Sequence, residues 1–114
     1  RVYVGVDGGG TKTAAAALVS PGLLLYPSAP RGSSNPNAVG EAAAREALAG
    51  AVRDAIELAR ANAVYAGSIA PGDVHIAGVC LCLSGCDSPA DVARTEGWIA
   101  EDLPELKEHG VNVT

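Results

Sequence analysis

The stretch Asp7-Gly8-Gly9-Gly10-Thr11-Lys12-Thr13 decides how the first part of this 114-residue chain folds. Valines alternate with other residues over positions 2–6, which is the period-two pattern of a strand with one buried face. Asp7 ends that strand, and the three glycines after it predict a tight turn. Residues 13–19 are rich in alanine and predict a second strand, covered on both faces. The stretch therefore predicts strand, turn and strand.

The same stretch has the groups that a magnesium–nucleotide site needs. Its carboxylate is a hard oxygen ligand for a metal, its glycines let backbone N–H groups approach an anion, and Thr-Lys adds a hydroxyl and a cation. A plain hairpin is the alternative, since Asp-Gly alone is a strong turn signal. A bare turn needs neither three glycines nor Thr-Lys-Thr, and the spacing is not that of a Walker A loop. The candidate phosphate- and metal-binding residues are Asp7, Gly8, Gly9, Gly10, Thr11 and Lys12.

The middle of the chain predicts a third strand and a long helix. Residues 23–26 are strand-like, and a polar loop follows over 30–40. A helix is expected from about 38 to 66, because apolar residues recur there at three- and four-residue steps. The residues of its expected buried face are Leu48, Val52, Ala55 and Ala59.

The last part of the chain alternates strand and helix. Residues 74–83 form a near-continuous apolar run, which is typical of a central strand buried on both faces. Ser88 is placed to cap a second helix that ends near Pro104, and residues 111–114 predict a last strand. We therefore expect an α/β fold with a mixed five-stranded sheet, its elements in the order β-β-β-α-β-α-β.

Composition excludes several classes of function. The net charge is −5 with only 8 basic residues, so a protein whose main task is binding nucleic acid is not expected. No apolar run approaches the roughly 18 residues that a membrane span needs. The three cysteines, Cys80, Cys82 and Cys86, are an odd number in one segment, which favours reduced thiols in a cytoplasmic protein. We expect them to be buried in the apolar core, in preference to a metal or iron–sulfur site.

The turn motif resembles the first phosphate motif of the actin-like ATPase domain, an RNase H-like fold shared by sugar kinases, Hsp70 and actin. The expected three-strand meander and alternating helices are similar to the N-terminal half of that fold. The triple glycine resembles the motif found in the group of proteins to which N-acetylglucosamine kinase and the BadF/BadG/BcrA/BcrD-type ATPases belong. The bacterial ROK sugar kinases carry a similar motif with two glycines. This resemblance extends over the whole chain.

Two further segments resemble N-acetylglucosamine kinases. Ser34-Asn35 is similar to the loop of that family whose asparagine contacts the sugar. Residues 81–87, Leu-Cys-Leu-Ser-Gly-Cys-Asp, are similar to a Leu-Ser-Leu-Ser-Gly-Gly-Asp segment that follows the fourth strand. Cys86 stands where the family has glycine, which alters the freedom of the backbone at that turn.

The resemblance implies a role for each matching residue. The glycines and Thr11 would hold the phosphates of ATP, and Asp7 would act on Mg²⁺ through water. Asn35 would bind sugar hydroxyls, and Ser84 and Gly85 would line the same cleft. The catalytic base of the family is an aspartate that would fall just after Thr114, so no catalytic residue is expected within this chain. We therefore expect residues 1–114 to be the N-terminal domain of a two-domain protein, and to be inactive without the second domain.

The function implied by the resemblance is ATP-dependent phosphorylation of an amino sugar, N-acetylglucosamine giving N-acetylglucosamine 6-phosphate. A BadF-type activator ATPase and a ROK-type glucokinase are alternatives. An RNase H-like nuclease fits the expected strands, but we find no further carboxylates near residues 81–84 to serve it. A non-catalytic nucleotide- or partner-binding module is the last alternative. The sequence leaves the oligomeric state open, a homodimer included.

Overall fold

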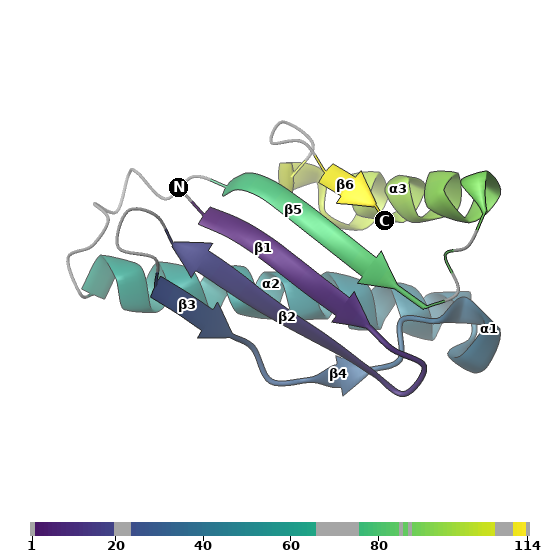
Figure 1. Ribbon diagram of the computed structural model, residues 1–114, viewed down its shortest axis with the longest axis horizontal. Coiled ribbons are helices and arrows are strands. Elements are labelled where there is room, and N and C mark those ends of the chain that lie inside the picture. Colours follow the sequence, from purple (N-terminus) through teal and green to yellow (C-terminus); the bar gives the residue numbers. More distant parts are fainter. Residues whose placement is uncertain are drawn as a thin grey trace.

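The computed structural model of the protein describes residues 2–19, 24–65, 76–84, 86, 88–106 and 111–113. These residues form a mixed β-sheet with a long helix packed against one face (Figure 1). The expected α/β class and mixed sheet are confirmed. The elements are β1 (Val2–Gly8), β2 (Lys12–Val19), β3 (Leu24–Pro27), β4 (Arg31–Gly32), α1 (Pro36–Val39), α2 (Glu41–Tyr65), β5 (Ile76–Leu83), α3 (Pro89–Asp102), the 3-10 turn η2 (Pro104–Leu106) and β6 (Val111–Val113).

Strand β1 lies at the centre of the sheet. The order is β3-β2-β1-β5-β6, and the two-residue β4, which the sequence did not predict, pairs with β2. β1 is antiparallel to β2 and parallel to β5, and β5 is parallel to β6. The carboxyl ends of β1 and β5 therefore meet at one corner of the molecule, where the β1–β2 turn and α1 also lie (Figure 1).

The two faces of the sheet differ in cover. Along β1, Val2, Val4 and Val6 are buried, while Tyr3 and Asp7 are exposed, so the predicted alternation is confirmed. In β2 the same alternation holds, and Ala14, Ala16 and Leu18 are only partly buried. The prediction that β2 is covered on both faces is therefore wrong. Helix α2 covers one face of the strand, and the other face is only partly buried.

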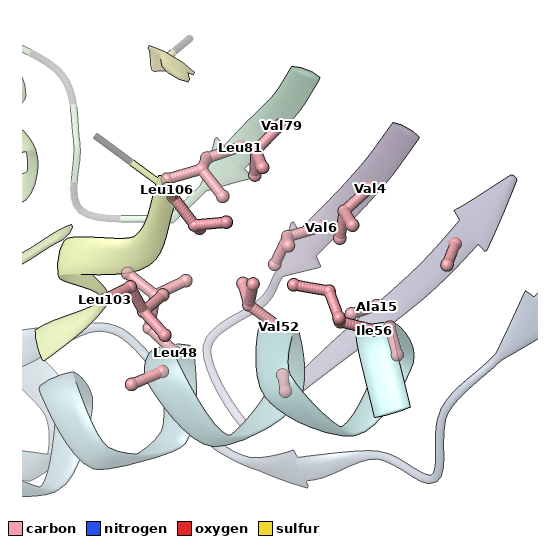
Figure 2. Close-up of a cluster of buried hydrophobic side chains, with 14 of the residues drawn as sticks. Val4, Val6, Ala15, Leu48, Val52, Ile56, Val79, Leu81, Leu103 and Leu106 are labelled. Atoms are coloured by element: carbon pink, nitrogen blue, oxygen red, sulfur yellow. The ribbon is translucent and has the colours of Figure 1, made fainter. Parts of the chain in front are cut away.

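The core lies between that covered face and α2 (Figure 2). Valines of β1 and Leu81 of β5 meet side chains of α2, and Leu103 and Leu106 close one end. The four residues predicted for the buried face of the helix are all confirmed as core: Leu48, Val52, Ala55 and Ala59.

The helix expected over 38–66 is interrupted. Gly40, at φ 86°, separates the short α1 from α2, and Ala66 lies outside the described residues. Asn35 caps α1 and Pro36 begins it, a start signal that the periodicity analysis missed. A left-handed residue cannot continue an α-helix, and glycine adopts that conformation without steric cost. The glycine therefore sets the angle between the two helices.

The prediction that the cysteines are buried is wrong. Cys80 and Cys82 are exposed and Cys86 is half-buried, although Val79 and Leu81 between them are core. Successive residues of a strand point to opposite faces, and the cysteines of β5 point to the face that α2 leaves uncovered. The three cysteines form no disulfides with one another.

The described parts of α3, β3 and β6 lie close to the positions that the sequence predicted for them. Ser88 caps α3, as the sequence predicted, and the structure adds a capping box in which Asp91 accepts from the Ser88 N–H. β3 begins at Leu24 and β6 spans three residues, while Leu23, residues 66–75 and Thr114 lie outside the described residues. No described helix is long and apolar enough to cross a membrane.

Helix α3 is attached to the start of α2 through polar groups. Trp98, which is buried, donates its indole N–H to Glu41 Oε1 at 3.0 Å, and the guanidinium of Arg94 lies 5.3 Å from the centre of the Trp98 ring. Arg45 of α2 donates to Asp102 Oδ1 at 2.8 Å and to Glu101 Oε2 at 2.7 Å. The hydrogen bonding of Arg45 to the Asp102 carboxylate lowers the pKa of Asp102 below its ordinary value.

Replacing Arg45 with methionine is expected to weaken the fold in a pH-dependent way. The folded chain binds fewer protons at Asp102 than the unfolded chain, whose carboxyl titrates at about 3.9. The Arg45–Asp102 ion pair therefore stabilises the fold above that pH, and it loses its effect as the pH falls through the lower pKa that Asp102 has in the folded state. Urea unfolding should show a lower midpoint for Arg45→Met than for wild type at neutral pH, and a smaller difference at about pH 2.

Arg60→Met is the matched control. Arg60 lies on the same helix, is exposed, and reaches only Glu57 at 3.6 Å, so its loss should change little at either pH. An Arg45→Met effect of equal size at both pH values would contradict the assigned role of the Asp102 carboxylate.

Candidate functional site

The glycine-rich stretch forms the turn between the first two strands. β1 ends at Gly8, β2 begins at Lys12, and the N–H of Gly9 donates to the carbonyl of Lys12 at 2.9 Å. Gly10, Thr11 and Lys12 are exposed at its tip. The predicted strand, turn and strand are therefore confirmed, and the turn presents its backbone to solvent where an anion can approach.

Close packing explains why position 8 is glycine. A Cβ atom placed there would lie 2.3 Å from Ser34 Oγ and 2.7 Å from Leu83 Cδ2. At Gly10, by contrast, a Cβ would meet nothing within 4 Å. Among the described glycines only Gly40 has positive φ, so the glycines of the turn do not adopt left-handed backbone. Gly8 therefore permits close approach of the Ser34 loop and β5, while the space around Gly10 is open.

The loop over residues 33–35 is fixed to this turn. The hydroxyl of Ser33 donates to the Gly9 carbonyl at 3.4 Å and accepts from the Asn35 N–H at 3.0 Å. Thr13 at the start of β2 donates its hydroxyl to the Gly32 carbonyl at 2.8 Å. The segment that carries Asn35 is thus held against the glycine-rich turn, although Ser33 and Gly9 are 24 residues apart in sequence.

Asn35 is both a cap and a candidate ligand. Its Oδ1 accepts from the Asn37 N–H at 2.9 Å, which fixes the side chain at the start of α1. The side-chain amide NH₂ is a further pair of donors, which suits sugar hydroxyl oxygens. The capping bond thus orients this amide group before any ligand arrives.

Ser84 brings the end of β5 to the same place. Its N–H donates to the Gly8 carbonyl at 2.7 Å, and its side chain is exposed. Gly85, the other residue predicted for this segment, lies outside the described residues. The structure therefore gathers the β1–β2 turn, the Ser33–Ser34–Asn35 loop and Ser84 at the carboxyl ends of β1 and β5.

Asp7 lies at the same strand end on the opposite face from Gly8. It is exposed, opposite Ala14 on one side and Cys82 on the other. An open groove of about 490 Å³ runs over this face past Asp7, Cys80 and Cys82. Asp7 is therefore accessible to solvent and to ligand.

One carboxylate at this position fits Mg²⁺ brought by a nucleotide. No group of three or more His, Cys, Asp or Glu side chains in the described part of the chain could hold a metal ion by itself. Mg²⁺ is usually bound in nucleotide sites by one or two carboxylates together with phosphate oxygens and water. The exposed Asp7 carboxylate, next to the turn, meets that requirement for an ion carried by ATP.

A second, larger hollow has a structural explanation. It measures about 680 Å³ and is lined by Arg31, Arg45 and Arg53. Arg31 donates Nε to Asp54 Oδ2 at 2.7 Å, Arg45 is held by the end of α3, and Arg53 donates to the Asp102 carbonyl. Each guanidinium thus already has an acceptor, and the hollow is part of the contact between β4, α2 and α3.

Sequence reasoning missed the residues that hold the site together. Ser33, Thr13 and Gly32 join the loop to the turn; Thr13 closes the glycine-rich motif, but nothing in that motif indicates its bond to Gly32, and Ser33 and Gly32 lie in no local motif. The only local signal was the capping pattern Asn35-Pro36, which marks where the loop ends and α1 begins.

Comparison with known proteins gives one informative match. No protein-family model matches the chain. Over 113 residues it is 29% identical to the N-acetyl-D-glucosamine kinase of Dictyostelium discoideum. The match takes in 98% of this chain and 34% of that protein, so the chain spans about a third of the relative's length. The chain is thus similar, nearly from end to end, to one part of a sugar kinase.

Proposed function

We propose that this chain forms the phosphate- and sugar-binding part of an ATP-dependent kinase whose substrate is an amino sugar, N-acetylglucosamine giving N-acetylglucosamine 6-phosphate. The junction at Gly8 carries the proposal, because an anion-binding type of turn, an asparagine loop and Ser84 meet there. The similarity over 113 residues to an N-acetyl-D-glucosamine kinase supports the same activity.

The arrangement of strands supports an RNase H-like, actin-like ATPase domain within that proposal. An antiparallel β3-β2-β1 meander precedes two parallel strands joined by helical connections. In sheets of this kind ligands bind outside the carboxyl ends of the parallel strands. The candidate residues lie at that edge, as the proposal requires.

Each candidate residue has a task in the proposed reaction. Gly8 and Gly9 shape the turn, and the exposed residues Gly10, Thr11 and Lys12 bind the phosphates of ATP through backbone N–H groups, a hydroxyl and a cation. Asp7 would hold Mg²⁺ through water, and a bound ion would supply positive charge to offset that of the phosphates. Asn35, Ser84 and Gly85 orient the sugar.

The attacking group is a sugar hydroxyl, whose oxygen forms a bond to the γ-phosphorus of ATP as the bond to the ADP oxygen breaks. Its proton passes to a base that the proposal places outside these 114 residues. The proposal also includes a second domain that completes the cleft, and a cytoplasmic location.

ADP release by the full-length protein tests the activity directly. With MgATP, release is expected with N-acetylglucosamine and not with glucose or without sugar. The reason is that the proposed transfer needs the hydroxyl of N-acetylglucosamine as the acceptor of the γ-phosphoryl group. Release with glucose alone would indicate a different sugar kinase. Release without any sugar would contradict the proposal and indicate an activator-type ATPase.

Asp7→Asn tests the metal-binding role. We expect kcat to fall by about 10²–10³-fold, the usual cost of losing one group that stabilises transition-state charge. Thermal unfolding should change little, because the side chain is exposed. Glu57→Gln, the same change at an exposed carboxylate on α2, is the control and should keep wild-type turnover. Wild-type turnover in Asp7→Asn would contradict the metal-binding role.

A further inference from the structure

Ser34 has a buried hydroxyl that forms no hydrogen bond. Its side chain is 2% exposed, and its Oγ is the single buried side-chain nitrogen or oxygen without a partner in the part of the chain that the structure describes. Burying a hydroxyl without a partner costs free energy, and buried polar groups in folded proteins are nearly always paired. An unpaired group at this depth therefore needs a physical explanation.

The surrounding polar groups do not supply that partner. Ser33 bonds to Gly9 and Asn35, and Thr13 bonds to Gly32. The carbonyl of Gly8, the residue against which Ser34 packs, accepts from the Ser84 N–H at 2.7 Å. These neighbouring polar groups bond to one another, and none of them is a hydrogen-bond partner of the Ser34 hydroxyl.

Folding alone does not require a serine here. A Cβ at position 8 would lie 2.3 Å from the hydroxyl, so Ser34 occupies space that only glycine leaves free. Alanine at position 34 would fill most of the same space without burying an unpaired oxygen. The hydroxyl therefore lowers the stability of the ligand-free protein. A hydrogen bond that compensates for this loss forms in another state of the protein, such as a complex with a ligand.

The position of the hydroxyl indicates that state. It lies against the carboxyl ends of β1 and β5, between the phosphate-type turn and Leu83, and it is next in sequence to the candidate sugar ligand Asn35. Its neighbours Ser33 and Asn35 are fixed by hydrogen bonds, whereas the Ser34 hydroxyl has no bond to break when its side chain rotates toward a ligand. A ligand seated at these strand ends is the nearest source of a new partner.

We infer that Ser34 is a sugar-binding residue whose hydroxyl is unpaired in the ligand-free protein and forms a hydrogen bond to an oxygen of the sugar when the sugar binds. This inference rests on the proposed function and adds a specific sugar contact to it. A serine hydroxyl can donate one hydrogen bond and accept two, which matches a sugar hydroxyl in either direction. The free energy lost in burying the hydroxyl is then recovered only in the complex.

Ser34→Ala in the full-length protein gives two effects of opposite sign. Without ligand, its unfolding temperature should equal or exceed that of wild type, because an unpaired buried hydroxyl is removed. Its Kd and KM for N-acetylglucosamine should rise roughly 3- to 10-fold, the effect of one hydrogen bond. The KM for ATP should stay unchanged, because the turn that binds phosphate is intact.

Ser28→Ala is the matched control, because it removes a serine hydroxyl that is paired. Ser28 donates its hydroxyl to the Ala15 carbonyl at 3.1 Å. Its loss should lower the unfolding temperature and leave the sugar KM unchanged. Ser34→Thr keeps the hydroxyl and should retain more sugar affinity than Ser34→Ala.

The outcomes separate this inference from the proposed function. If wild type binds N-acetylglucosamine and Ser34→Ala binds it equally well, the inference fails and the kinase proposal stands. A ligand-free Ser34→Ala that melts below wild type, as Ser28→Ala should, also overturns it. If wild type binds no N-acetylglucosamine by calorimetry, both fail together.

Discussion

The packing of α2 against the sheet is the interaction on which the rest of the structure depends. Four alanines of the helix, Ala44, Ala51, Ala55 and Ala59, are each 0% exposed, and these small side chains let the helix pack closely on the sheet. With α2 seated this closely, Asp54 meets Arg31 of β4 and Glu41 meets Trp98 of α3. One helix thus positions both the loop before it and the helix after it.

Covering only one face of the sheet also shapes the candidate site. Gly8 points to the covered side, where the Ser34 loop packs on it, and Asp7 points to the open side. Two consecutive residues at the end of a single strand therefore contribute to opposite faces of the candidate site, with the loop over residues 33–35 on one face and the Asp7 carboxylate on the other. This division requires no extra structural element, since it follows from the pleat of the strand.

Sequence patterns predicted the features that depend on near neighbours. The alternation of β1, the buried face of α2 and the Ser88 cap of α3 are all encoded within a few residues, and the structure has them. The exposure of Cys80 was not predictable, because an apolar run does not reveal whether a helix covers one face of a strand or both. The contacts of Ser34 with Gly8 and of Arg45 with Asp102 also escaped, since they join residues far apart in the chain.

The indole of Trp98 has a practical consequence for studying this protein. It is the single tryptophan of the 114 residues, and it is buried where α3 meets the start of α2, hydrogen-bonded to Glu41 and covered by Arg94. Its fluorescence therefore reports the docking of α3 on α2. Because the indole belongs to that helix contact and not to the β1–β2 turn, its emission reports whether the fold is intact. It does so separately from ligand binding at the carboxyl ends of β1 and β5.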